Sequence, residues 1–460
     1  MMRSAFQAIQ FSSGSSHSRN LTAFALTALL ASAIIFGGGG VRYGFANLFV
    51  QLAALFVLGL NRTIVLDFWR SSQWSLRALT AFSIAIPIIH LVPMPTHILG
   101  YLPGRELVLQ SLELAESDRW FPISVDPART LVALIGLILP FTVLAIGWSV
   151  SRENLVKIGW GLVLLGMVNL IPGFVQVLSE GKLGLFYPEN PMPGVFFGTF
   201  ANRNSTGLFL LSAFSLASLL PAPFRHKAFP FARLVICILL LLAIVLTRSR
   251  TAMVLSAVPI LIWFFRSMGD VQSAESGFFR RIHRFRLIGL LAGAIGAIAI
   301  LGLLTASPGR IGQSLERFEA IDDARAYIWD DAAYTADKYW PIGTGMGTFD
   351  EVFQLDESLE NLSSRRAGRA HNDYIEITIE AGVLGLFLVA GWLILAGWYS
   401  WKARKSRHRW AAWAGSVILL CIALQSITDY PLRNQAMLAV ASFALVLLFR
   451  MSADERRSSP

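Results

Sequence analysis

Apolar residues of this chain come in blocks of roughly twenty, separated by short polar segments. Roughly twenty residues of helix are needed to cross the ~30 Å hydrocarbon core of a bilayer. The pattern therefore predicts an all-α polytopic membrane protein with about twelve transmembrane helices, at residues 21–40, 44–60, 75–95, 128–150, 155–178, 203–222, 230–247, 251–267, 287–306, 373–400, 410–428 and 434–451.

The same pattern divides the chain into five parts. We predict a disordered cytoplasmic tail at 1–20, helices one to nine within 21–306, a large periplasmic loop at 307–372, helices ten to twelve within 373–451, and a cytoplasmic tail at 452–460. Ala31-Ser32-Ala33 resembles a signal-peptide cleavage site, but the many later spans favour an uncleaved anchor.

The distribution of charged residues indicates how these spans are oriented in the membrane. Only 15% of the residues are charged, against about 25% in soluble proteins. The net charge of +10 does not indicate nucleic-acid binding, because the basic residues fall in short loops that alternate with the apolar blocks. Such loops face the cytoplasm. This places the N-terminus in the cytoplasm and the large loop outside.

The large loop is the one long polar stretch of the chain, and it is acidic. Apolar residues recur at roughly helical intervals between Ser314 and Trp340, which predicts a helix there. Pro341 should end it, and the glycines of Gly343–Gly347 should form a turn. Long loops with structure of their own are often functional.

The junction Arg369–Gly385, where this loop meets the tenth span, concentrates reactive side chains. Asp373 and Glu376 have the spacing of a helix N-cap and its partner. Asn372, Tyr374 and His371 are then expected near the lipid–water boundary. His371 is the candidate catalytic residue; the alternative is a surface histidine at a helix start.

Two acids follow in the same span. Glu376 and Glu380 are four residues apart and share a helical face. A carboxylate near the membrane is costly unless it has a polar partner. These acids either support the site or form ion pairs that hold helices together. Gly382 and Gly385 are interpreted as small packing residues.

Arginines are expected at the same outer surface. Arg248 and Arg250 lie in the tight turn between the seventh and eighth spans, and Arg325 lies in the predicted loop helix. A guanidinium keeps its charge and binds phosphate through two hydrogen bonds. The alternatives are snorkelling to the interface for the first two and a salt bridge to a neighbouring aspartate for Arg325.

Two more segments reach this surface. Asn202, Arg203 and Asn204, at the outer end of the sixth span, could hydrogen-bond a sugar or a phosphate, or simply cap the helix. Asp429 lies in the short turn between the last two spans, where capping the turn is the alternative. A histidine with arginines and amides at the lipid boundary suits a diphosphate whose tail stays in the membrane.

The sequence contains few motifs that would bind a metal or another cofactor. The chain has no His-x-x-His spacing, no phosphate-binding glycine loop, and two cysteines, Cys237 and Cys421, that lie inside apolar blocks. The pairs Asp322-Asp323 and Asp330-Asp331 could hold Mg²⁺ through oxygen atoms. We predict no metal and no other cofactor, and no nucleic-acid partner.

These residues resemble the O-antigen ligase and polymerase superfamily of bacterial membrane glycosyltransferases. The resemblance covers about residues 195–435 and rests on Phe200–Asn204, Ser249-Arg250, Arg325 with Trp329, Pro341–Phe349, His371–Tyr374 and Glu380–Gly385. The His-Asn-Asp-Tyr junction is its most specific part.

The resemblance implies transfer of a glycan from an undecaprenyl-diphosphate carrier at the outer face of the inner membrane, without a metal. His371 would act at the acceptor hydroxyl, and Arg250 and Arg325, with Arg248 assisting, would hold the diphosphate. The acceptor stays open among lipid A–core, a growing glycan and a protein hydroxyl, as in a ligase, a polymerase or a protein O-oligosaccharyltransferase. A transporter or flippase for the same lipid is the rival from another class.

Overall fold

The computed structural model describes residues 20–40, 42–116, 120–183, 186–187, 192–224, 226–272, 324–362 and 366–453, without the side chains of 62, 267–272 and 324. Most of the predicted N-terminal tail, the ninth span at 287–306, the first part of the large loop with Asp322-Asp323, and most of the C-terminal tail lie outside these residues.

The described chain is built of helices, as predicted. A first helix, Asn20–Gly39, ends in the 3-10 turn η1 (Gly37–Gly39). The α-helices after it are α2 (Gly44–Leu60), α3 (Arg62–Ser71), α4 (Trp74–His90), α5 (Thr96–Leu99), α6 (Glu106–Leu114), α7 (Pro127–Gly136), α8 (Ile138–Ser149), α9 (Arg152–Leu178), α10 (Arg203–Leu219), α11 (Phe229–Leu246), α12 (Arg250–Leu255), α13 (Ala257–Gln272), α16 (Ala324–Lys338), α17 (Phe349–Asp356), α18 (Asp373–Ala403), α19 (Arg409–Gln425) and α20 (Gln435–Ser452).

The chain is a multi-pass membrane protein. Among the described residues, six helices are long and apolar enough to cross a membrane, or seven if α2 and α3, bent by 83°, form one span. The six are Asn20–Gly39, Pro127–Ser149 (α7 with α8), α9, α11, α18 and α20. The predicted spans 75–95 and 410–428 correspond to α4 and α19, shorter apolar helices of 17 residues each. The predicted span 251–267 is divided into α12 and α13.

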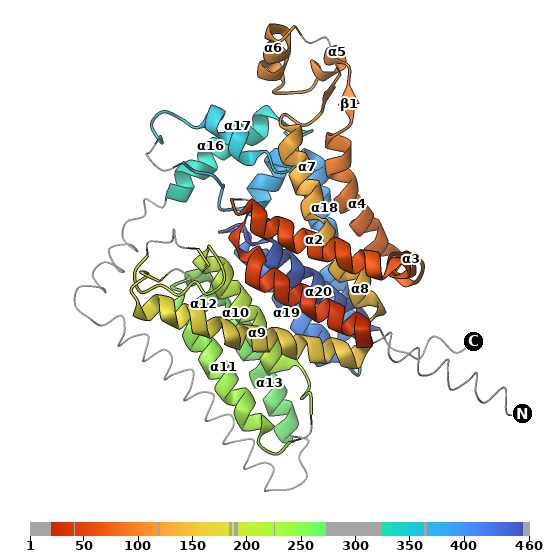
Figure 1. The fold of residues 1–460 in the computed structure, drawn as a ribbon, viewed down its shortest axis with the longest axis vertical. Coiled ribbons are helices and arrows are strands. Elements are labelled where there is room, and N and C mark those ends of the chain that lie inside the picture. The colour runs from red at the N-terminus through yellow and green to blue at the C-terminus, as the bar shows by residue number, and fades with distance from the viewer. Residues whose placement is uncertain are drawn as a thin grey trace, which may run out of the picture.

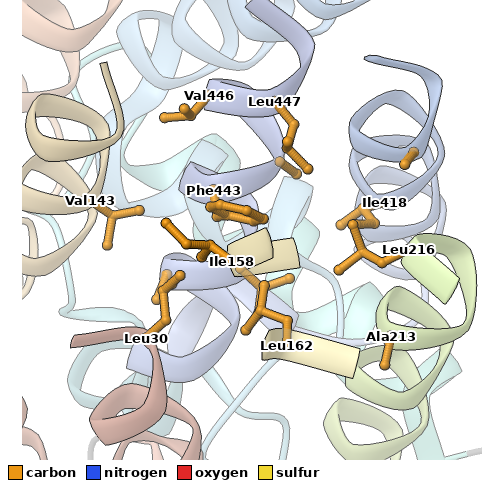
Figure 2. Packing of buried hydrophobic residues seen from close by; sticks show 14 of the residues in the cluster. Leu30, Val143, Ile158, Leu162, Ala213, Leu216, Ile418, Phe443, Val446 and Leu447 are labelled. Atoms are coloured by element: carbon orange, nitrogen blue, oxygen red, sulfur yellow. The ribbon is translucent and has the colours of Figure 1, made fainter. Parts of the chain in front are cut away.

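Helix α20 lies at the centre of the bundle and is buried along most of its length. Figure 2 shows Phe443 of α20 among Val143 of α8, Ile158 of α9 and Ile418 of α19. A Cβ atom on Gly415 of α19 would lie 2.4 Å from a backbone oxygen of α20. Small residues of this kind let membrane helices approach closely, since lipid offers no hydrophobic driving force between them.

Helix α18 is interrupted at Gly382, which has a φ of +53°. The freed carbonyl oxygens of Ile379 and Glu380 accept hydrogen bonds from the backbone N–H groups of Thr344 and Gly345, both at 2.9 Å. A Cβ atom on Gly382 would lie 2.0 Å from the Pro341 oxygen. Gly382 is therefore a close-packing position, as interpreted from the sequence, and it also interrupts α18 where the predicted glycine turn packs against the helix.

The described part of the large loop forms a helical layer over one end of the spans, which is called the outer end because the sequence predicts that it faces away from the cytoplasm (Figure 1). Helices α16 and α17 share a small core with Ala370 and Ile379. Arg129 of α7 pairs with Glu351 of α17 at 2.6 Å. The predicted loop helix ends at Lys338, just before Pro341, as the sequence indicates. This layer fixes the segment that leads into α18.

A second outer segment follows α4 and contains a short ladder of β1 (Pro93–Met94) with β2 (Phe121–Pro122) and the helices α5 and α6, which project from the bundle (Figure 1). Its buried Arg105 donates to the Gly343 oxygen at 2.7 Å and to the Ile123 oxygen at 2.8 Å. Burial lowers the pKa of Arg105 to about 10. That value is still well above neutral pH, so the guanidinium remains charged. Arg105 thus holds the glycine turn from the outside.

Candidate active site

His371 lies at the last turn of the chain before α18. Its Nδ1 is 3.3 Å from Oδ1 of Asp429, and its ring packs edge-on against Tyr430 at 5.0 Å between centroids. The His371 side chain is 35% exposed, whereas that of Asp429 is only 1% exposed. One side of the imidazole therefore meets a buried carboxylate and another part of it faces solvent.

The backbone at His371 is held in an uncommon conformation. His371 has a φ of +51°, in the left-handed region that few residues other than glycine adopt. The preceding carbonyl oxygen, of Ala370, accepts a hydrogen bond of 2.8 Å from Nε1 of Trp329 on α16. The outer helical layer thus fixes the position from which the imidazole reaches Asp429.

Asn372, rather than Asp373, caps α18. The Asn372 Oδ1 accepts from the N–H groups of Tyr374 at 2.9 Å and Ile375 at 3.2 Å. Asp373 is the first helical residue, and its carboxylate instead accepts from the Ser426 hydroxyl at 3.0 Å. The predicted cap was wrong by one residue, because tertiary partners bind the Asp373 carboxylate. The Tyr374 hydroxyl donates to the Ala423 oxygen of α19.

Asp429 also connects to the outer end of α10. Nδ2 of Asn202 donates to Oδ2 of Asp429 at 3.3 Å, while Oδ1 of Asn202 accepts from the Asn204 N–H at 2.8 Å. Asn202 therefore caps α10, which was the alternative given from the sequence, and it also contacts Asp429. The Asn204 carbonyl oxygen accepts from Gln425 at 3.0 Å. Arg203 is the half-buried first residue of α10.

Tyr430, beside His371, was not singled out by sequence. Burial raises the pKa of the Tyr430 phenol to about 12, and the neighbouring Asp429 carboxylate acts in the same direction. The phenol is therefore neutral at any physiological pH. Tyr430 serves as a packing surface for the imidazole, and no second base is expected from it.

Arg250 and Arg248 lie at the outer end of the same group of helices. Arg250 begins α12 after Ser249, whose hydroxyl caps the helix. The next residue, Thr251, has its hydroxyl oxygen 3.3 Å from that of Thr428, the residue before Asp429. Both arginines are exposed, and Arg248 has a φ of +53°. The predicted arginine turn is therefore next to the Asp429 turn.

Arg325 lies on α16, four residues before Trp329. Residues four apart share a helical face, so Arg325 is on the side of α16 that meets the His371 segment. Oδ2 of Asp331 accepts from the Ser358 backbone and hydroxyl and from Nδ2 of Asn361, which assigns it to holding the loop together. Within the described ranges, no group of three or more His, Cys, Asp or Glu side chains could hold a metal ion.

A buried charge cluster lies directly behind the histidine. Arg433 contacts Asp373 at 3.2 Å, Glu376 at 3.2 Å and Glu380 at 2.6 Å, and Arg369 contacts Glu376 at 3.0 Å. Burial alone would lower the pKa of Arg433, but the three carboxylates outweigh it and raise the pKa above its usual value. Both glutamates are fully buried, so they make ion pairs between elements.

Arg433 was missed by the sequence analysis. The available signal was the stripe of three acids at positions 373, 376 and 380, which requires a positive partner from another element. Nothing in the sequence alone names that partner, because Arg433 reaches the stripe only after the turn η2 (Pro431–Arg433) brings α20 beside α18.

Residues 235–390 match the family model described as O-antigen ligase. The chain carries an O-antigen ligase family domain. The domain runs from α11 to the middle of α18 and includes Arg248, Arg250, Arg325 and His371. Asp429 and Arg433 come from beyond its matched end. No curated protein matches the chain significantly.

The match confirms the family resemblance stated from the sequence, and it is typical of O-antigen ligase-type membrane enzymes. Chemically, the O-antigen ligase domain presents an imidazole whose one ring nitrogen meets a buried carboxylate, with arginines on adjoining elements. Such a group can accept a proton from a hydroxyl, and fixed positive charge can stabilise an anion that forms beside it.

Proposed function

We propose that the protein is a membrane glycosyltransferase that moves a glycan from an undecaprenyl-diphosphate carrier to an acceptor hydroxyl. The observation that carries this proposal is the contact of 3.3 Å between Nδ1 of His371 and Oδ1 of Asp429, within an O-antigen ligase family chain. The exposed part of the imidazole is on the side from which an acceptor can approach.

In this proposal His371 is the general base. With the proton on Nδ1 donated to Asp429, the lone pair of Nε2 is available to the acceptor. The acceptor oxygen attacks the anomeric carbon of the donor sugar, the bond from that carbon to the diphosphate oxygen breaks, and the hydroxyl proton moves to Nε2. Undecaprenyl diphosphate leaves with the bonding electron pair. The buried Asp429 carboxylate stabilises the imidazolium.

Arg250 and Arg325, with Arg248 assisting, would hold the donor diphosphate. The leaving group gains negative charge as the sugar departs, and fixed guanidinium groups stabilise that charge without reorganising. The contact between Thr251 and Thr428 supports this role for Arg250, because it puts the start of α12 beside the Asp429 turn. No metal is required by this scheme.

The remaining predicted residues would support the site. Asn202 holds the second oxygen of Asp429, Asn372 and Asp373 fix the start of α18, and Glu380 binds Arg433. Tyr374 ties α18 to α19 through its hydroxyl. Arg203 and Asn204 lie on the first turn of α10, where a glycan could be hydrogen-bonded.

The topology belongs to the same proposal. We infer about twelve spans, with the N-terminal tail at 1–20 and the C-terminal tail at 452–460 in the cytoplasm and the loop at 307–372 in the periplasm. The loop charges support this orientation. It gives a protein of the bacterial inner membrane whose site faces the periplasm, where lipid-linked glycans meet lipid A–core, growing glycan or protein acceptors.

A flippase for the same lipid would need a polar route through the membrane for the glycan. The large cavity in the described part of the chain is lined mainly by apolar side chains. This supports the transferase over the flippase. A ligase, a polymerase and a protein O-oligosaccharyltransferase would share the chemistry and differ in the acceptor.

The test is His371→Ala with His97→Ala as its control. His97 is an exposed histidine on α5, in the other outer segment. Both variants are assayed for glycan transfer in membranes that contain equal amounts of protein. We expect loss of transfer for His371→Ala and unchanged transfer for His97→Ala. Normal transfer by His371→Ala would overturn the catalytic role.

A further inference from the structure

A large cavity of about 740 Å³ lies between α18 and α19, and residues of α4, α8, α13 and α20 also line it. Asp373, Tyr374 and Ser426 line its outer end, and Ser400 and Trp413 line its inner end. Leu393 and Leu420 line it as well and are 45% and 46% exposed. The cavity is therefore accessible sideways, between α18 and α19, from the lipid.

The walls of this cavity are mostly apolar side chains. Its polar side chains mostly bond within the protein: the Ser426 hydroxyl donates to Asp373, the Tyr374 hydroxyl to the Ala423 oxygen, and the Ser400 hydroxyl to Ser416. Nε1 of Trp413 donates to the Ser400 oxygen at the inner end. A sugar or an ion would find few hydrogen-bonding groups in this cavity. An alkyl chain has no polar groups, so it would lose no hydrogen bonds by entering.

The depth of the cavity favours a long chain. Ser426 and Trp413 lie at its two ends on the same helix, thirteen residues apart by their numbers, which corresponds to about 20 Å of helix. One leaflet of the hydrocarbon core is about 15 Å thick, half of ~30 Å. A chain that enters at the outer end and fills the cavity must therefore extend past the region that outer-leaflet acyl chains occupy.

The outer end of the cavity adjoins the candidate site. Tyr374 follows His371 by three residues, and Ser426 precedes Asp429 by three. Thr428, next to Asp429, contacts Thr251 at the start of α12, which carries Arg250. A lipid whose chain fills the cavity would have its head group between the imidazole and the arginines.

We propose that this cavity holds the polyprenyl chain of the lipid-linked donor, which enters sideways between α18 and α19. This rests on the proposed function, since it takes the donor to be a polyprenyl diphosphate. The chain then anchors the donor and leaves the diphosphate at the outer mouth. The first part of the polyprenyl chain thus contacts the fixed apolar side chains of the cavity instead of the fluid bilayer.

Gly397 offers a direct test. It lines the inner half of the cavity, and a Cβ atom on it would meet nothing within 4 Å. Because the Cβ position is open, we expect the side chain of Gly397→Phe to project into the cavity and occupy part of it. Gly59→Phe is the matched control, because Gly59 is an exposed glycine of the apolar helix α2, away from the cavity, with the same open space.

Binding of undecaprenyl diphosphate and of the short farnesyl diphosphate is measured for both variants in nanodiscs. We expect Gly397→Phe to weaken undecaprenyl diphosphate binding by about tenfold or more, since buried methylene contacts are lost. Farnesyl diphosphate should bind as before, because its chain ends above Gly397, and Gly59→Phe should change neither affinity.

Unchanged affinity for undecaprenyl diphosphate in Gly397→Phe would overturn the proposal, and so would an equal loss for both lipids. As a second measurement, undecaprenyl phosphate with a photoreactive group partway along its chain, at the distance from the phosphate that reaches the inner end of the cavity, is cross-linked to the unaltered protein. Labelling near Trp413 supports the proposal. Labelling confined to other helices contradicts the proposal. A phospholipid that occupies the cavity and is not displaced by undecaprenyl phosphate contradicts it as well.

These experiments use binding and need no transfer, so they separate the two proposals. If His371→Ala transfers glycan normally while Gly397→Phe still loses the long chain, the catalytic role fails and the lipid site stands. If His371→Ala abolishes transfer while Gly397→Phe binds both lipids normally, the transferase stands and the lipid site fails.

Discussion

Nδ1 of His371 lies 3.3 Å from Oδ1 of Asp429, although 58 residues separate them in the chain. The imidazole is partly exposed and the carboxylate is almost fully buried. The pair joins the start of α18 to the turn that follows α19, so both helices must be in place before the imidazole is oriented.

Asp429→Asn should slow transfer while the protein stays folded. The amide keeps the shape of the side chain and its contact with Asn202, but it removes the charge that stabilises the imidazolium. We expect kcat to fall by roughly 10²–10⁴-fold, with the donor KM nearly unchanged. Steady-state kinetics in nanodiscs measure both. A rise in KM with an unchanged kcat would mean that Asp429 serves donor binding instead.

Arg250→Gln should weaken binding of the polyprenyl diphosphate. Loss of one charge-assisted contact to phosphate costs about 1.5–3 kcal/mol, or roughly 10- to 100-fold in affinity. The control is Arg366→Gln, which removes an arginine that pairs with Asp350 on the exposed surface of the outer layer. If the two variants bind the donor equally well, Arg250 has no part in holding the diphosphate.

Arg433→Met should destabilise the fold more than any surface arginine. It would leave Asp373, Glu376 and Glu380 buried with only Arg369 nearby. Removing one partner of a buried ion pair costs about 3–5 kcal/mol, whereas Arg366→Met at an exposed pair should cost about 0–1 kcal/mol. Thermal unfolding in detergent compares them, and equal melting temperatures would contradict the structural role of Arg433.

Gly382→Ala should disturb the outer half of α18. The new Cβ atom would lie 2.0 Å from the Pro341 oxygen, and the residue would keep a positive φ. We expect a loss of about 2 kcal/mol or more, from strain together with displacement of the glycine turn. Gly397→Ala, in the same helix with open space around it, should be neutral or slightly stabilising. A tolerated Gly382→Ala would show that the break can be repacked.

The sequence predicted the helical class, the loop helix that ends before Pro341, and the junction at His371, because each depends on local information. An apolar block of membrane length has few alternatives to a helix. Pro341 lacks the backbone N–H that a helix needs and its ring clashes with the preceding turn, which favours a helix end before it. The helix cap was predicted one residue late, at Asp373 instead of Asn372, since capping depends on where the neighbouring carboxylate finds a partner.

Only the tertiary structure decided which of these residues meet. Nothing local indicates that Arg433 neutralises the acids of α18, that Asp429 lies behind His371, or that the glycine turn bonds to the carbonyl groups freed at Gly382. These contacts join elements far apart in the chain. They form because buried charges and unpaired backbone groups in an apolar bundle must find partners, and the packing of α18, α19 and α20 determines which partners are within reach.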